Sequence, residues 1–111
     1  MPAVPTLVTS QCPVDYSFQR IGGKYKGRLL FLLQNGPTRY GQLRRLLPDV
    51  TPKMLTQALR ELESDNLVTR HAYIEVPPRV EYALTVTGTE LMPFIELLKQ
   101  WGTKQLGRGC S

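Results

Sequence analysis

The chain has 111 residues, of which 41% are hydrophobic and 21% charged, and its formal net charge is +5. This length and composition predict one small globular domain, whose limited core favours further burial by dimerisation. The longest apolar run, residues 29–33, is too short for a membrane span, no targeting signal is visible, and two distant cysteines do not form a secreted disulfide framework. We therefore expect a cytoplasmic protein without a membrane partner.

Positive charge is concentrated in the middle of the sequence. Residues 20–60 contain nine basic side chains and one acidic side chain, Asp49. Residues 61–111 contain five basic and seven acidic side chains. Because such an asymmetry attracts polyanions, the middle of the chain is predicted to face one.

The N-terminal part is predicted to contain a flexible arm and two helices. Residues 1–11 are uncharged and lack periodicity, which indicates the arm. A helix follows Cys12, its expected N-cap, with Pro13 at the first helical position, and it ends before Gly22-Gly23. Its buried side should consist of Val14, Phe18 and Ile21. Residues 24–34 form the next helix, which is apolar almost all round and therefore belongs in the core.

A turn signal at residues 35–37 precedes a helix-turn-helix pattern. Residues 39–40 are expected to add a very short strand, and residues 41–47 to form a short helix. The inward side of that helix should consist of Leu43, Leu46 and Leu47. A tight connection, residues 48–50, leads to a helix from Thr51 to about Asn66, and this arrangement is typical of helix-turn-helix proteins.

The helix after Thr51 has two contrasting faces. Thr51 is the expected N-cap, and Pro52 occupies the first helical position. One face is an apolar stripe of Leu55, Ala58, Leu59 and Leu62. The other face carries no acid and consists of Lys53, Thr56, Gln57 and Arg60. Because Arg and Gln read base edges in the major groove, the pattern predicts a recognition helix, although an ordinary amphipathic surface helix is the alternative.

After Asn66 the periodicity changes to two. Residues 67–74 and 79–84 are predicted strands, and the prolines within residues 75–78 stiffen the loop between them. A helix-turn-helix followed by a hairpin is a winged helix, in which Arg70 and Arg79 should serve the wing. The alternative is that the hairpin only decorates the sheet.

The last helix is expected to begin at Thr85 or Thr87 and to bend at Pro93. Its apolar stripe consists of Leu91, Phe94, Ile95, Leu98 and Trp101. A small winged helix has little core left to cover this stripe, so the N- and C-terminal helices are predicted to form a two-fold dimer interface. The fold is thus predicted to be mainly α with a small β-hairpin wing, over residues 12–106, with a frayed tail at residues 107–111.

Several short motifs follow one another in a fixed order along the chain. They are Cys12-Pro13-Val14, Ile21-Gly22-Gly23-Lys24, Tyr40-Gly41-Gln42-Leu43-Arg44-Arg45, Thr51-Pro52-Lys53-Met54-Leu55-Thr56, Leu59-Arg60-Glu61-Leu62-Glu63, Asp65-Asn66-Leu67-Val68-Thr69-Arg70, Glu75-Val76-Pro77-Pro78-Arg79-Val80-Glu81-Tyr82 and Trp101-Gly102. Together these motifs resemble the HxlR family of bacterial winged-helix transcription regulators. The resemblance covers residues 12–102; the family often has Trp where this chain has Tyr25. It implies a homodimeric repressor or activator on promoter DNA, frequently responsive to electrophiles or oxidants through the cysteine at the Cys12 position.

Cys12 is the reactive candidate. A thiol at a helix N-cap faces the positive end of the helix dipole, which favours the thiolate, although Asp15 in the first turn opposes this effect. If both terminal helices build the interface, Cys12 of one chain could lie near Cys110 of the other, so both cysteines are redox candidates. A buried, inert Cys12 is the alternative.

Other chemistries are excluded by the residues available. His71 is the only histidine, and with two separated cysteines it offers no zinc spacing. Gly22-Gly23 lies between helices rather than after a strand, so no phosphate-binding loop is expected. We therefore predict no metal, no cofactor and no enzymatic activity.

The contacts with double-stranded DNA are assigned as follows. Base or phosphate contacts of the recognition helix are Thr51, Lys53, Met54, Thr56, Gln57 and Arg60. Phosphate contacts elsewhere are Lys24, Lys26, Arg39 and Arg44. Two alternative functions remain: a winged-helix module that binds a protein instead of DNA, and a regulator that senses a small molecule in a pocket near the dimer interface.

Overall fold

The computed structural model describes residues 12–109, so the predicted arm and Cys110 lie outside the described residues. Its elements follow in the order α1 Pro13–Ile21, α2 Lys26–Leu33, β1 Thr38–Arg39, α3 Tyr40–Leu46, α4 Pro52–Ser64, β2 Val68–Tyr73, β3 Arg79–Leu84, α5 Val86–Glu90 and α6 Met92–Leu106. The prediction of a mainly helical fold with a small hairpin is confirmed. Among the described residues, no helix is both long and apolar enough to cross a membrane.

Leucines of α2, α3 and α4 form the centre of the core. The fully enclosed ones are Leu29, Leu30, Leu33, Leu43, Leu55, Leu59 and Leu62. Their burial confirms the apolar stripe predicted for α4 and the central position predicted for α2. Leu46 was expected to face inward but is 50% exposed, because α3 ends there and the chain turns to bury Leu47 instead.

Both ends of α4 are closed by local hydrogen bonds. The Thr51 side chain accepts a hydrogen bond of 3.1 Å from the backbone N–H of Met54, as expected of an N-cap. At the other end Asn66 adopts a left-handed φ of 61°, and the N–H of Leu67 donates to the carbonyl of Leu62. This Schellman motif ends the helix and turns the chain into β2.

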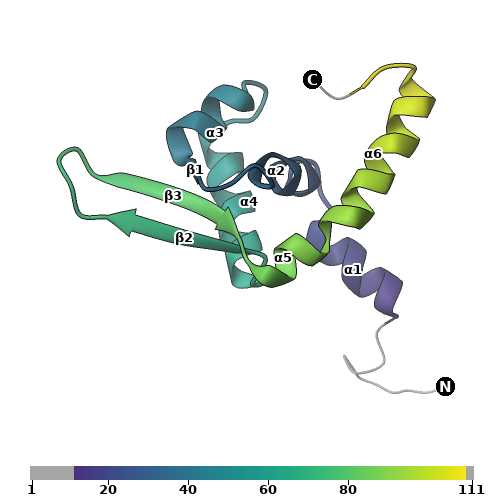
Figure 1. Ribbon diagram of the computed structural model, residues 1–111, viewed down its shortest axis with the longest axis horizontal. Coiled ribbons are helices and arrows are strands. Elements are labelled where there is room, and N and C mark those ends of the chain that lie inside the picture. The colour runs from purple at the N-terminus through teal and green to yellow at the C-terminus, as the bar shows by residue number, and fades with distance from the viewer. Residues whose placement is uncertain (1–11, 110–111) are drawn as a thin grey trace.

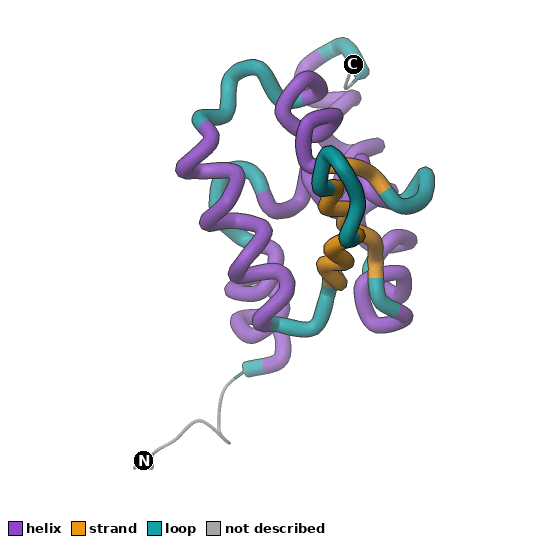
Figure 2. Tube along the Cα trace, turned by 90° about the vertical axis from the view of Figure 1, so that its left-hand side faces the viewer, coloured by secondary structure: helices purple, strands orange, loops and turns teal. Residues whose placement is uncertain are grey.

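The three strands form one antiparallel sheet in the order β1-β3-β2. β2 pairs with β3 along its whole length, from Val68 opposite Leu84 to Tyr73 opposite Arg79. β1 adds a short edge, with Thr38 opposite Tyr82. The β2-β3 hairpin is the wing; it projects away from α1 and α6 in Figure 1, and Figure 2 views its loop end-on.

The segment after β3 differs from the prediction of one helix bent at Pro93. It forms two helices, α5 and α6, which meet at Leu91. The cause is Pro93, which has no N–H to continue the hydrogen bonding of α5 but is tolerated in the first turn of α6. Thr85, not Thr87, caps α5, because its side chain accepts a hydrogen bond from the N–H of Gly88.

α1 is less buried than predicted. Ile21 is buried, but Val14 is 60% and Phe18 50% exposed. The reason is that α1 lies against the body only through its C-terminal end and through an edge-on contact of Phe18 with Phe94 of α6, whose ring centroids are 6.1 Å apart. The rest of its apolar side is left uncovered by residues 12–109.

Candidate nucleic-acid interface

The polar face of α4 is exposed, as its sequence predicts. Lys53, Gln57 and Arg60 are exposed on this face, and no acid lies in the first turn of the helix. Met54 is 37% exposed beside them. Thr56 is half-buried, since its hydroxyl lies 3.3 Å from the hydroxyl of Tyr40 at the start of α3. The helix-turn-helix therefore presents one cationic, amide-bearing surface, anchored to α3 at Tyr40.

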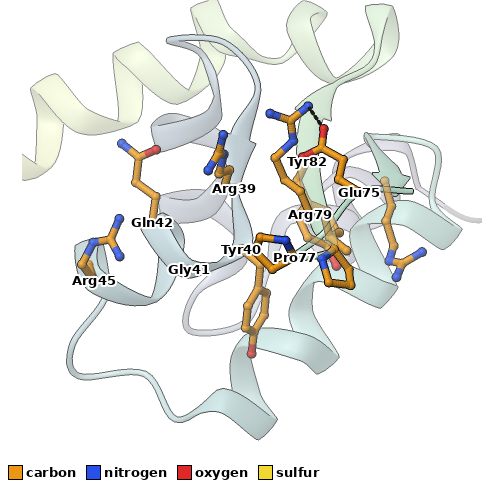
Figure 3. Close-up of a pocket in the computed structure, with 12 residues that line it drawn as sticks. Arg39, Tyr40, Gly41, Gln42, Arg45, Glu75, Pro77, Arg79 and Tyr82 are labelled. Atoms are coloured by element: carbon orange, nitrogen blue, oxygen red, sulfur yellow. Dashed lines mark ion pairs between the residues drawn. The ribbon is translucent and has the colours of Figure 1, made fainter. Parts of the chain in front are cut away.

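An open groove of about 840 Å³ lies between the start of α3 and the wing. Its cationic side chains come from both sides: Arg39 and Arg45 from the α3 side, Arg70 and Arg79 from the wing. Figure 3 shows Arg39 and Arg45 across the groove from Arg79 and Glu75. The pairing of β1 with β3 brings these distant segments together.

The arginines of this groove differ in how strongly they are held. Arg79 forms ion pairs with Glu75 at 3.1 Å and with Glu81 at 3.8 Å, and its guanidinium lies 3.9 Å from the ring centroid of Tyr73. Arg39, Arg45 and Arg70 make no ion pair with any residue in the range 12–109. The three unpaired guanidiniums are therefore available to an anion, whereas Arg79 mainly stiffens the wing.

The predicted phosphate contacts of α2 also fall into two groups. Lys24 is exposed in the turn before α2. Lys26 forms a 2.6 Å ion pair with Glu61 of α4, and its side chain is only 13% exposed. A phosphate contact by Lys26 would have to break this pair. Arg44 is exposed and lines a separate open hollow at the turn between α3 and α4.

Two carboxylates near this surface are held in their charged form. Asp49 accepts hydrogen bonds of 2.8 and 2.9 Å from Arg28, which lower the pKa of its carboxyl group. Hydrogen bonds from Lys26 and then from Gln57 lower the pKa of Glu61. Both acids are therefore neutralised by partners, which leaves the unpaired arginines to set the local charge.

Sequence reasoning missed Arg45, Gln42 and Tyr40 as parts of the groove. The sequence instead predicts Arg44, the neighbour of Arg45, as the phosphate contact. No local pattern shows that the wing lies opposite this end of α3. The signal available was the motif itself, in which an aromatic residue, an amide and two arginines fall within six positions.

The cysteine and histidine candidates lie away from the groove. Cys12 is a free, exposed thiol at the start of α1 and makes no side-chain capping hydrogen bond. His71 lies on β2 with its ring edge-on to Tyr73. Among residues 12–109, no group of His, Cys, Asp and Glu side chains is arranged to hold a metal ion.

This arrangement coincides with a known family of regulators. The family model of the HxlR-like helix-turn-helix matches residues 20–109. The chain belongs to this family. Membership makes it a transcriptional regulator of the helix-turn-helix type and not an enzyme, as the sequence predicts.

Individual relatives agree with the HxlR assignment. The uncharacterized HTH-type transcriptional regulator YkvN of Bacillus subtilis (strain 168) is 48% identical over 91 residues, which cover 82% of this chain and 77% of YkvN. The structure of the redox regulator HypR in its oxidized form is 45% identical, with a TM-score of 0.80 over 84% of this chain and 96% of HypR. The structure of HypR in its reduced form is 44% identical, with a TM-score of 0.81 over 84% of this chain and 92% of that HypR chain.

Proposed function

We propose that this HxlR-family chain regulates transcription by binding double-stranded promoter DNA, with α4 in the major groove. The observation that carries the proposal is the link between two surfaces: the exposed face of α4, which has no acid in its first turn, and the groove, which has three arginines without an ion pair to a described residue. Tyr40 joins them, because it lines the groove and its hydroxyl lies 3.3 Å from that of Thr56 on α4. Arg60 and Gln57 have the chemistry to read base edges, and Lys53 and Thr51 lie at the helix start, nearest to the positive end of its dipole. Such a protein works in the cytoplasm of a bacterial cell.

The groove provides the electrostatic part of binding. Arg70 of the wing and Arg39 and Arg45 on the α3 side line it from opposite sides, which suits a phosphate backbone running along it. Each phosphate neutralised by such a cation releases counterions, so affinity falls as salt is raised. A winged-helix module that binds a protein instead of DNA would need an acidic partner to cover the same arginines.

We propose a homodimer because apolar side chains of two helices are left uncovered by the described part of the chain. On α1 these are Val14, Tyr16 and Phe18, and on α6 they are Leu97, Leu98, Trp101 and Leu106, each between 41% and 69% exposed. Exposed apolar side chains in such number on two helices favour an interface. Of the stripe predicted from sequence, Ile95 is buried in the core of its own chain, so Leu98 and Trp101 carry the dimer contact.

Oxidation at Cys12 is the regulatory input that we propose. The thiol is exposed at the end of α1, beside the surface proposed for dimerisation, and HypR, a relative of similar fold, is a redox regulator. A peroxide accepts two electrons from the thiolate, which becomes a sulfenic acid as the O–O bond breaks. A second thiol, such as Cys110 of the other chain, can then displace water from it and form a disulfide.

A second candidate input is a small organic molecule. A groove of about 560 Å³ lies between α1, α2 and α6, within the usual size range of ligand pockets. Its walls are mainly apolar, with Phe18 and Ile21 from α1, Phe31 from α2, and Ile95 and Leu98 from α6. A ligand there would separate or clamp the same helices that are proposed to form the dimer.

The proposed function is tested by capture of genomic DNA fragments on the pure protein, followed by sequencing of what is retained. The proposal expects a few fragments that share one two-fold symmetric site in promoter regions. The proposal would be contradicted if fragments were retained in proportion to their abundance and shared no site. The captured sites also supply the operator and the neighbouring genes.

A further inference from the structure

Gln57, in the middle of the exposed face of α4, is held by a chain of side chains that leads back to α2. Its Nε2 donates a 2.6 Å hydrogen bond to Oε2 of Glu61, one turn further along the helix. Oε1 of the same carboxylate lies 2.6 Å from Nζ of Lys26. Lys26 is largely enclosed, with a side chain that is 13% exposed, so the chain of contacts ends at a fixed point.

This arrangement gives the Gln57 amide one orientation. An amide has a donor end and an acceptor end, whereas a carboxylate only accepts hydrogen bonds. Glu61 therefore holds the nitrogen end, and Oε1 of Gln57 is turned away from it. The pKa of Glu61 is lowered by its contact with Lys26 and then by that with Gln57, so the carboxylate stays charged at neutral pH.

Resting on the proposed DNA binding, we propose that Lys26 and Glu61 are positioning residues that make Gln57 select adenine in the major groove. Adenine presents an acceptor at N7 and a donor at N6, which match the second N–H and the Oε1 of an amide fixed in this way. Guanine presents O6 where adenine has its amino group, so Oε1 of Gln57 would face another acceptor. The fixed amide thus discriminates between the two purines.

A purely structural link between α2 and α4 is the alternative role of these three residues. The two helices are already joined by fully enclosed leucines, among them Leu30 and Leu59, whereas Gln57 is exposed and adds little to that packing. A structural link would change the free energy of unfolding when cut, but it would not change which base is preferred. Base preference is therefore the measurement that separates the two roles.

The experiment is selection from a randomised duplex DNA pool, with the full chain and with Gln57→Ala, Glu61→Gln and Lys26→Met. In Glu61→Gln, the new amide has only one oxygen, which accepts the hydrogen bond from Lys26. Its nitrogen then faces Gln57, so Gln57 must turn its own oxygen toward residue 61, and the Gln57 amide is reversed. Glu63→Gln is the matched control, because it removes the same charge from the same helix. Glu63 is exposed and makes no ion pair with a described residue.

The wild-type chain is expected to prefer adenine over guanine at one position of each half-site by about fivefold to 150-fold, the range of a bidentate contact. Gln57→Ala should abolish this preference. Glu61→Gln and Lys26→Met should each lower the preference for adenine by at least about fivefold. Glu63→Gln should raise the overall affinity for DNA but leave the preference for adenine unchanged. Since Glu61 is partly exposed, its variant is expected to fold even if Lys26→Met does not.

Two results would overturn the inference, and they are distinguishable. If the wild type enriches one site but Glu61→Gln keeps every base preference, the positioning role is wrong and the proposed DNA binding stands. If the wild type enriches no sequence from the pool, the proposed function fails and the positioning role fails with it.

Discussion

Gly88 of α5 lies against the backbone carbonyl of Leu67, so closely that a Cβ atom at position 88 would collide with that oxygen. The same carbonyl accepts a 3.1 Å hydrogen bond from the N–H of Thr85, and the Thr85 hydroxyl donates to the carbonyl of Asn66 at 2.7 Å. These contacts join the two ends of the wing. Gly88 therefore fixes the base of the hairpin, and any larger residue at position 88 would force α5 and Leu67 apart.

Gly88→Ala should destabilise the fold by about 1–3 kcal/mol, the usual cost of forcing extra atoms into a packed site. Urea unfolding measures the change. Gly41→Ala is the matched control, because a Cβ there meets nothing closer than 4.0 Å, and alanine in a helix should be neutral or gain up to about 1 kcal/mol. Equal stabilities for the two variants would show that α5 does not pack on Leu67 as described.

Leu98→Glu and Trp101→Glu should convert the proposed dimer to monomers. Both side chains are exposed in the single chain, 41% and 64%, so the charge costs little in the monomer and much in an apolar interface. Sedimentation at micromolar concentration should give twice the chain mass of 12.6 kDa for the wild type and the chain mass for the variants. Ile74→Glu, in the fully exposed wing loop, should remain dimeric. A wild type that sediments as a monomer would remove the dimer.

Cys12→Ser should abolish the response of DNA binding to oxidants while leaving the affinity of the reduced protein unchanged. Wild-type affinity should change by at least about tenfold, or 1.4 kcal/mol, after mild peroxide or diamide and recover with a thiol reductant. Cys110→Ser separates two routes, since it blocks a crosslink seen on non-reducing gels but spares a sulfenic acid at Cys12. A Cys12→Ser protein that responds like the wild type would refute sensing at this position.

The Arg28–Asp49 pair should contribute a pH-dependent part of the stability. Arg28 lowers the folded-state pKa of Asp49 below its ordinary value of 3.8. The contribution is therefore present above pH 3.8 and is lost as the pH falls through the lower folded-state pKa. Urea unfolding should show a difference in the free energy of unfolding between the wild type and Asp49→Asn. This difference should have its full size at neutral pH and should disappear as the pH is lowered below that value. A difference that stays constant with pH would contradict the pairing.

How far the sequence predicted the structure depends on whether the deciding interaction is local. The start of α4 follows from Thr51 and Pro52, and its leucine stripe follows from helical spacing; both are confirmed. The sequence predicts only a bend at Pro93, where the structure has two separate helices. The packing of Gly88 against Leu67, which holds α5, could not be predicted because the two residues are distant in sequence. Periodicity identified the apolar side of α1 but could not tell that the described part of the chain leaves Phe18 half exposed.

The candidate site shows the same limit. The exposed face of α4 could be predicted, because Lys53, Gln57 and Arg60 recur with helical spacing. The groove could not, since the pairing of β1 with β3 is what places Arg45 opposite Arg70. The ion pair of Lys26 with Glu61 likewise joins two helices whose contact no local pattern reveals.

The central claim is that α4 and the groove of arginines form the DNA interface. It is tested most directly by titration of a labelled, selected duplex with wild type, Arg60→Ala and Arg70→Ala at several salt concentrations. Arg60→Ala should weaken binding by about 1–3 kcal/mol. Arg70→Ala should weaken binding to all DNA sequences alike and reduce the slope of log affinity against log salt concentration by about one unit. Lys104→Ala removes the same charge from α6 and should change neither affinity nor slope. If both arginine variants bind with wild-type affinity and wild-type slope, the interface lies elsewhere and the account is wrong.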